Sequence, residues 1–61
     1  MSEIKFIPLT YSDGTKTYVK ADAIVQLVEG QGCTFVYTIN DGSPMAVKES
    51  MDEILYDLSN L

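Results

Sequence analysis

The sequence predicts an α+β domain in which about five short antiparallel strands, joined by hairpins, are followed by one C-terminal helix. Two Asp-Gly pairs, at 13–14 and 41–42, each stand between runs rich in β-branched and aromatic residues, as hairpin turns do. After Ser50, apolar residues recur at the spacing of an amphipathic helix. These signals fill the chain without a linker, so we expect a single domain over 1–61. They leave open whether the sheet stays open or closes into a barrel.

Residues 3–11 and 15–20 predict the two strands of a first hairpin, connected by the first Asp-Gly turn. Pro8 has no backbone N–H to donate, so we expect its strand to lie at an edge or to carry a bulge there. Residues 21–23 interrupt the β-branched run and predict a short turn or a single helical turn.

Three further strands are predicted over 24–28, 33–39 and 45–48. The first of these is apolar on both faces apart from Gln26, so we expect one face to meet the helix or another subunit. The second alternates cleanly. We expect the face that carries Cys33 and the aromatic residues to point inward, with the thiol acting as a small buried hydrophobe.

The C-terminal helix is predicted to begin after Ser50, whose side chain caps it while Glu53 completes a capping box. Its apolar stripe consists of residues at positions i, i+3, i+4 and i+7, which are Met51, Ile54, Leu55 and Leu58. We expect the sheet to cover this stripe, because a helix of about 11 residues is marginal by itself in water.

Composition excludes several classes of function. The chain has nine acidic residues, four lysines, no arginine and no histidine. Nucleic acids and anionic membranes are usually bound through clustered Lys and Arg, so this balance argues against both and fits a protein partner with a basic surface. Cys33 is the only cysteine, which excludes an internal disulfide, and without histidine the usual ligand sets of structural zinc are missing.

The chain is expected to be cytoplasmic and to self-associate. Its N-terminal residues show neither the basic and apolar regions of a signal peptide nor a run long enough to span a membrane. One free thiol suits a reducing compartment. A domain of 61 residues gains a thin stability margin from its own core, and with neither a disulfide nor a metal we expect a homo-oligomer.

No group of residues predicts catalysis. Asp13 and Asp41 lie in turns, where Asp is favoured for hydrogen bonds to the local backbone. No histidine accompanies Cys33, and no glycine-rich loop opens a helix to cradle a phosphate. We therefore expect no enzymatic activity, no metal site and no cofactor.

The candidate contact residues are apolar side chains on strands and tyrosines, a residue type that is enriched at interfaces. They are Val25, Leu27, Val36, Tyr37, Tyr11 and Tyr56. For each of them, ordinary packing within the domain remains the alternative to a contact with a second copy or a partner.

Six segments form a pattern of strand ends, turns and a helix start: Leu9-Thr10, Asp13-Gly14, Asp22-Ala23-Ile24, Asp41-Gly42, Val47-Lys48-Glu49-Ser50 and Met51-Asp52-Glu53-Ile54. This pattern resembles the small flagellar and swarming-motility proteins of the FlbD/SwrD type and their relatives encoded by phages and other mobile elements. Because most of these residues serve turns and a cap, the resemblance implies a fold more than a function. The chain departs from the flagellar members at 30–33, where Gly-Gln-Gly-Cys replaces an acidic-Pro-Asp-Thr turn.

We expect a non-catalytic protein-interaction or regulatory module of bacterial or phage origin that acts as a small homo-oligomer. One alternative is a phage accessory inhibitor of a host defence or regulatory system, acting as a nucleic-acid mimic or by sequestering a nucleotide signal. Another, which the resemblance implies, is a flagellar or swarming regulator. Acidic residues aligned on one face would favour mimicry. A basic pocket at an interface would favour a nucleotide, and the lysines available for it are Lys5, Lys16, Lys20 and Lys48.

Overall fold

The computed structural model describes residues 4–39 and 41–61 and confirms the α+β fold class. The elements, in chain order, are β1 (Phe6–Thr10), β2 (Lys16–Lys20), a 3-10 turn η1 (Ala21–Ala23), β3 (Ile24–Glu29), β4 (Thr34–Thr38), β5 (Met45–Val47) and α1 (Met51–Ser59). The single helical turn predicted over 21–23 is therefore present. The predicted strand start at Glu3 and the turn residue Asn40 lie outside the described residues.

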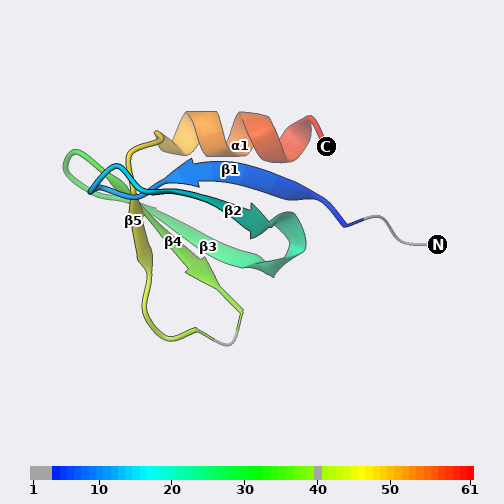
Figure 1. Cartoon of the computed structure of the whole chain (residues 1–61), viewed down its shortest axis with the longest axis horizontal. Coiled ribbons are helices and arrows are strands. Elements are labelled where there is room, and N and C mark those ends of the chain that lie inside the picture. The colour runs from blue at the N-terminus through cyan, green and yellow to red at the C-terminus, as the bar shows by residue number, and fades with distance from the viewer. Residues whose placement is uncertain (1–3, 40) are drawn as a thin grey trace.

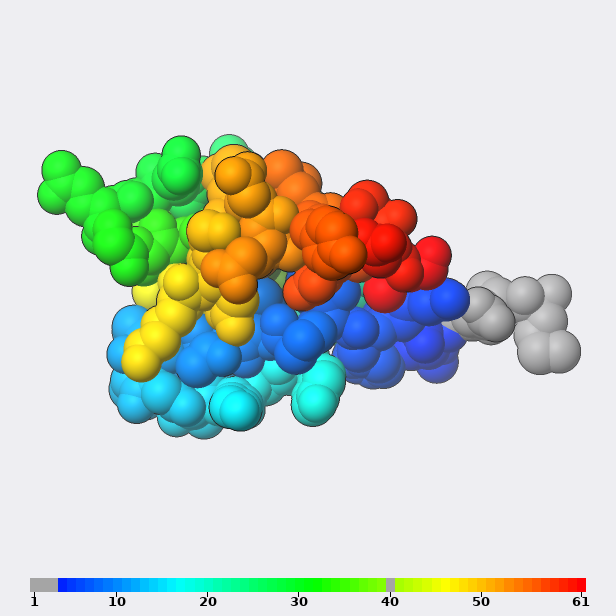
Figure 2. Space-filling view, turned by 90° about the horizontal axis from the view of Figure 1, so that it is seen from above, coloured from blue at the N-terminus to red at the C-terminus, as the bar shows by residue number. Residues whose placement is uncertain are grey.

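The strands form two antiparallel sheets, β1–β2 and β3–β4–β5, which do not close into a barrel. Figure 1 shows the two sheets as separate layers, with α1 running alongside β1. In the view from above, the β1–β2 hairpin forms one side of the molecule and α1 covers much of the other (Figure 2). The layers join at one corner, where Tyr11 bridges Val47 and the Lys48 N–H donates to the Thr10 carbonyl at 2.8 Å.

Within the β1–β2 hairpin, side chains alternate between the core and the solvent. Ile7 and Leu9 are each 1% exposed. Phe6, which precedes Ile7, and Pro8, which lies between the two, face outward. Pro8 lies opposite Tyr18 in a sheet of two strands, so the prediction of an edge position for the proline is confirmed.

Strand β3 carries a bulge, which accounts for part of its continuous apolar sequence. The register of β3 against β4 shifts between Ile24 and Gln26, which makes Val25 the extra residue. Val25 and Gln26 are consequently both exposed in succession, while Ile24 and Leu27 pack against the core.

Strand β4 turns the opposite face to the core from the one we expected. Thr34 and Val36 are buried, whereas Phe35 is half-buried and Ile39, just beyond the strand, is 58% exposed. The prediction that Cys33 lies on the inward face, as a buried hydrophobe, is therefore wrong, and its thiol is partly exposed. Thr34 tolerates burial because its hydroxyl donates to the Glu49 carbonyl at 2.8 Å.

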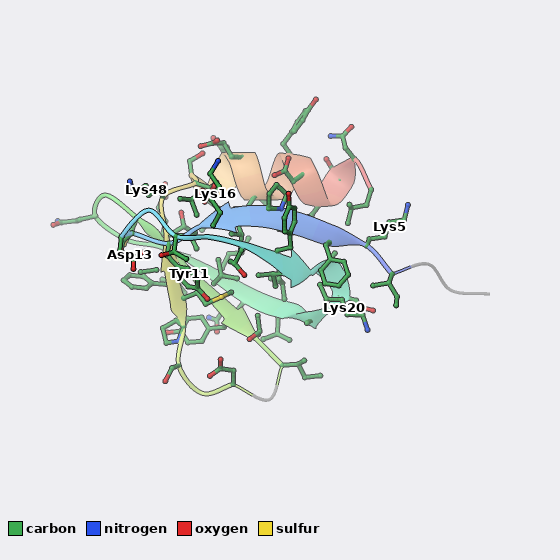
Figure 3. All side chains as sticks on the ribbon, viewed as in Figure 1. Lys5, Tyr11, Asp13, Lys16, Lys20 and Lys48 are labelled. Carbon is green, nitrogen blue, oxygen red and sulfur yellow. The ribbon has the colours of Figure 1, made fainter. Side chains whose placement is uncertain are left out.

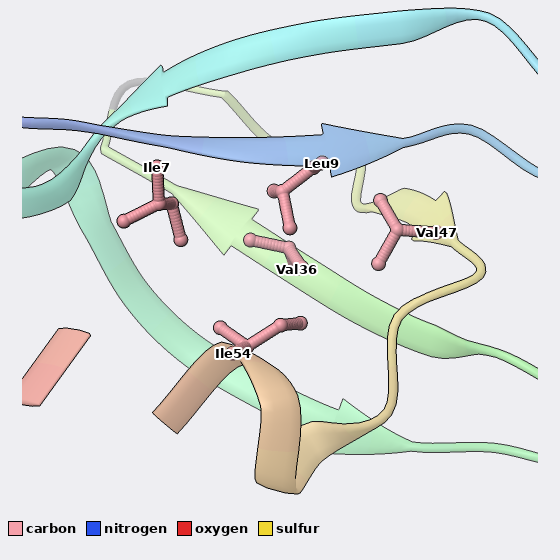
Figure 4. Close-up of a cluster of buried hydrophobic side chains, with 5 residues drawn as sticks. All are labelled: Ile7, Leu9, Val36, Val47 and Ile54. Atoms are coloured by element: carbon pink, nitrogen blue, oxygen red, sulfur yellow. The ribbon is translucent and has the colours of Figure 1, made fainter. Parts of the chain in front are cut away.

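The core is small and is centred on one helical residue. Its fully buried hydrophobic members are Ile7, Leu9, Val36, Val47 and Ile54 (Figure 4). Ile54 of α1 inserts between the two sheets, and α1 contacts β1 and β3. The helix has nine residues, and the predicted capping box between Ser50 and Glu53 is present with hydrogen bonds of 3.0 and 3.1 Å.

The helix covers less of its apolar stripe than we expected. Met51 and Leu58 are half-buried, but Leu55 is 49% exposed. The helix contacts β1 and β3, where Ile54 joins the core and Leu58 packs against it. The prediction that the sheet covers Leu55 is wrong.

The segment between β5 and α1 is held by Glu49. The Glu49 carboxylate accepts hydrogen bonds from the Thr10 N–H at 2.8 Å and from the Thr10 hydroxyl at 2.9 Å. Burial raises the pKa of Glu49, but the two hydrogen bonds from Thr10, a bond from its own backbone and the charge of Lys16 together outweigh burial, so the pKa lies below its usual value. A charged Glu49 thus bonds to the end of β1, next to the bridge between Tyr11 and Val47.

Candidate interaction surfaces

The outer side of the three-stranded sheet is an uncharged, mostly apolar surface. Register and alternation place five side chains there, and the exposed Ile39 directly follows β4. We call these residues the three-strand face: Gln26, Val28, Phe35, Tyr37, Ala46 and Ile39. Val28 lies opposite Phe35, and Phe35 lies opposite Ala46, so an apolar row crosses all three strands. Val28 is 37% exposed, and the bulge residue Val25, next to Gln26, is 64% exposed.

Phe35 is held flat on this face by a glycine. A Cβ atom built on Gly30 would lie 2.7 Å from Cε2 of the Phe35 ring, so the ring rests directly on the Gly30 backbone. The Gly30 N–H donates to the Cys33 carbonyl at 2.9 Å and closes the β3–β4 turn. Gly32 in that turn has φ +77°, a conformation that favours glycine. The turn therefore fixes an aromatic ring on the outer side of the sheet.

The outer side of β1–β2 has a different chemistry. It consists of Phe6, Pro8, Thr10, Lys16, Tyr18 and Lys20, which we call the hairpin face. Phe6 is 52% exposed and Tyr18 is 71% exposed. The register pairs Phe6 with Lys20, and Pro8 with Tyr18, so apolar and cationic side chains alternate across the two strands. This face lies opposite the three-strand face, because the inward sides of both sheets meet in one core.

The helix presents a third surface, which is acidic. Asp52, Glu53 and Asp57 surround Tyr56, which is 67% exposed, in a shallow hollow. The carboxylates sit on the exposed side of α1, and Glu53 also serves the capping box.

A hollow of about 200 Å³ lies between the β3–β4 turn and the start of α1. Cys33 and Lys48 line it, together with Glu49 and Ser50. The chain has no histidine to act as a base for the thiol. Lys5 lines a different hollow, near Leu61 at the C-terminal end of the helix. Lys5 and Lys48 therefore do not combine into one basic pocket.

The turn carboxylates have the structural roles that the sequence predicts. The Asp13 carboxylate accepts a hydrogen bond from the Thr15 N–H at 2.9 Å, and this bond lowers the pKa of Asp13. The Asp41 carboxylate accepts a hydrogen bond from the Ser43 N–H at 3.0 Å. Each aspartate thus stabilises its own turn.

Among residues 4–39 and 41–61, no cluster of three or more His, Cys, Asp or Glu side chains could hold a metal ion. The absence of a metal site, a cofactor and an enzymatic activity remains a prediction for the protein as a whole. In the same described residues, no helix is long and apolar enough to cross a membrane.

The structure separates the six residues predicted to make contacts. Val25 is exposed at the bulge, and Tyr37 is half-buried on the three-strand face. Leu27 is half-buried and packs against the core from the inner side of β3. Val36 is fully buried in the core, so its assignment to a contact between chains is wrong, because the inner side of β4 is used within the chain.

The two remaining candidates lie on other elements. Tyr11 is half-buried at the corner between the sheets, where its hydroxyl lies 3.4 Å from Sδ of Met45. Tyr56 is exposed on the outer side of α1, as its position off the apolar stripe predicts. These residues therefore do not form one surface, and only Val25 and Tyr37 lie on or beside the three-strand face.

Sequence reasoning missed the hairpin face and most of the three-strand face. The Lys-x-Tyr-x-Lys alternation of 16–20 could have indicated the hairpin face, because residues at i, i+2 and i+4 of a strand share one side. The three-strand face was missed, apart from Tyr37, because the side of 33–39 that carries Cys33 was expected to point inward.

Comparison of the chain with models of protein families, with curated proteins and with solved structures gives no match. The resemblance to the FlbD/SwrD type therefore remains a prediction from the turn and cap residues.

Proposed function

We propose that the chain is a non-catalytic protein-interaction module that acts as a small homo-oligomer, with the three-strand face as its self-association surface. The orientation of β4 carries this proposal. The strand directs Thr34 and Val36 to the core and leaves Phe35, Tyr37 and Ile39 on the outside. Burying the larger apolar face would gain more from the hydrophobic effect, so its outward position indicates that a second molecule covers it.

The chemistry of the face suits contact with an identical copy. None of its six side chains is charged, so two copies can meet about a two-fold axis without placing like charges opposite each other. The net charge of the chain is −5, and a contact through any of its acidic surfaces would add repulsion between copies. Aromatic side chains such as Phe35 and Tyr37 bury a large area at low cost in conformational entropy.

Light scattering over a range from micromolar to millimolar protein tests the proposal. We expect a mass that exceeds the single chain and falls on dilution. Val28→Lys places a charge in the middle of the apolar row and should shift the protein to monomer. Leu55→Lys is the matched control, because Leu55 is similarly exposed on α1, away from the three-strand face.

A single-chain mass at every concentration would overturn the oligomer. If Leu55→Lys dissociates the assembly and Val28→Lys does not, the interface lies on the helix instead. Circular dichroism establishes that each variant is folded, and Val25→Lys replaces Val28→Lys if the latter unfolds, because Val25 is more exposed.

A further inference from the structure

The hairpin face combines exposed aromatic and cationic side chains in a regular geometry. Alternation along β2 places Lys16, Tyr18 and Lys20 on one side of the strand. Figure 3 shows Lys16 and Lys20 at its two ends. Strand geometry puts the Cα atoms of the two lysines about 13 Å apart. Tyr18 stands midway between them, with Pro8 opposite it and Phe6 opposite Lys20.

The cationic groups of this face have weak partners within the chain. Lys20 lies 3.8 Å from Asp22 in an exposed ion pair, which is the kind that contributes little. Among the described residues, the Lys16 side chain forms no ion pair or hydrogen bond, although its charge helps to lower the pKa of Glu49, and the Tyr18 hydroxyl forms no hydrogen bond. The hairpin face holds two of the four lysines and none of the nine acidic residues of the chain. The Thr10 hydroxyl is bonded to Glu49, but the Lys16 ammonium, the Tyr18 hydroxyl and the weakly paired Lys20 ammonium are available to another molecule.

The charges distinguish the possible occupants. A nucleic acid is bound through many cationic contacts with successive phosphates, and two lysines on a chain of net charge −5 supply few. A membrane surface requires a similar cationic cluster. A protein segment can match this face with only two carboxylates, spaced as Lys16 and Lys20 are, and an apolar side chain between them. In an extended segment, residues i, i+2 and i+4 provide this arrangement on one side.

We propose that the hairpin face binds an extended acidic segment of another protein, with an apolar side chain seated on Phe6, Pro8 and Tyr18 and two carboxylates meeting Lys16 and Lys20. This inference is independent of self-association, because the hairpin face and the three-strand face lie on opposite sides of the molecule. The basic partner that the overall acidity suggests would have to use a different surface, such as the acidic side of α1.

The test uses a capped Glu-Thr-Phe-Thr-Glu peptide as the probe. Its binding is measured through the amide chemical shifts of the full chain. The matched control is Gln-Thr-Phe-Thr-Gln, which keeps the shape and removes both charges. We expect the glutamyl peptide to shift amides of β1 and β2 and to bind less tightly as salt rises. The double variant Lys16→Glu, Lys20→Glu should weaken its binding roughly tenfold. Lys48→Glu, outside the face, should have a far smaller effect.

Three results would overturn the proposal. The first is equal binding of the two peptides. The second is tighter binding of oligothymidylate than of the glutamyl peptide, which would make the face a nucleic-acid platform. The third is no shift with either peptide while a Lys16→Thr, Lys20→Thr double variant aggregates, which would show that the lysines guard an exposed strand edge. All three substituted positions, Lys16, Lys20 and Lys48, are exposed, so the variants should fold.

Discussion

The carboxylate of Glu49 accepts two hydrogen bonds from Thr10, one from its N–H and one from its hydroxyl, across 39 residues of sequence. This pair attaches the segment that leads into α1 to the edge of β1. The Glu49 carbonyl also accepts from the hydroxyl of Thr34 on β4. Strands β1 and β4 therefore both bond to one residue, which lies directly before the helix cap at Ser50.

Replacing Glu49 with Gln should destabilise the fold by about 1–2 kcal/mol, because hydrogen bonds to a charged group contribute more than neutral ones. The amide also directs an NH₂ group at one of the two donors of Thr10. Glu53→Gln is the matched control, since Gln can complete a capping box and Glu53 is exposed. Urea unfolding measures both variants, and equal losses of stability would contradict the role of Glu49.

The hydrogen bonds between Glu49 and Thr10 also predict that the stability of the fold depends on pH. The pKa of Glu49 in the folded chain lies below its ordinary value of 4.5, so its contribution is present above that pH and is lost as the pH falls. The unfolding free energy of the protein should therefore decrease below about pH 4.5, and the difference between the protein and Glu49→Gln should shrink there. A difference that stays constant from pH 7 to strong acid would show that the charge of Glu49 does not matter.

The helix should stabilise the fold mainly through Ile54 and very little through the neighbouring Leu55. Ile54 is fully buried between the sheets, and Ile54→Ala should cost about 2–5 kcal/mol, enough to unfold so small a domain. Leu55→Ala removes a side chain that is 49% exposed and should change stability by about 0.5 kcal/mol or less. Thermal unfolding followed by circular dichroism compares the two. Similar melting temperatures would contradict the described position of the helix.

The local signals of the sequence were sufficient for the order and type of the elements. The Asp-Gly turns and the capping box of Ser50 and Glu53 depend on nearest neighbours in the chain, and these are readable from sequence. The open arrangement of two sheets was not readable, because hairpin signals do not determine how one hairpin meets the next.

The orientation of β4 and the covering of Leu55 depend on tertiary contacts. Both faces of β4 carry residues that a core could accept. The inward face makes contacts with distant parts of the chain, such as the packing of Val36 in the core and the bond from Thr34 to Glu49, 15 residues away. Val36 was placed at an interface for the same reason, because alternation gives two faces and does not say which is inside. The candidate surfaces could therefore be identified only after the register and burial were known.

Gly30 should be required for the position of the Phe35 ring. In Gly30→Ala the new Cβ would lie 2.7 Å from the ring edge, so the ring must move away from the β3–β4 turn. We expect a loss of about 1–3 kcal/mol, the range for overpacked sites. Gly42→Ala is the matched control, because a Cβ there meets nothing within 4 Å and Gly42 needs no positive φ.

The prediction about Gly30 also connects stability with self-association. Because Phe35 lies in the apolar row of the three-strand face, a displaced ring should weaken the oligomer as well as the fold. Light scattering on Gly30→Ala, at a temperature where circular dichroism shows a folded chain, should give a lower mass than the unchanged protein at equal concentration. Gly42→Ala should leave both properties unchanged. If Gly30→Ala matches Gly42→Ala in urea unfolding, the ring does not rest on Gly30. If it is destabilised but associates normally, Phe35 is not part of the contact.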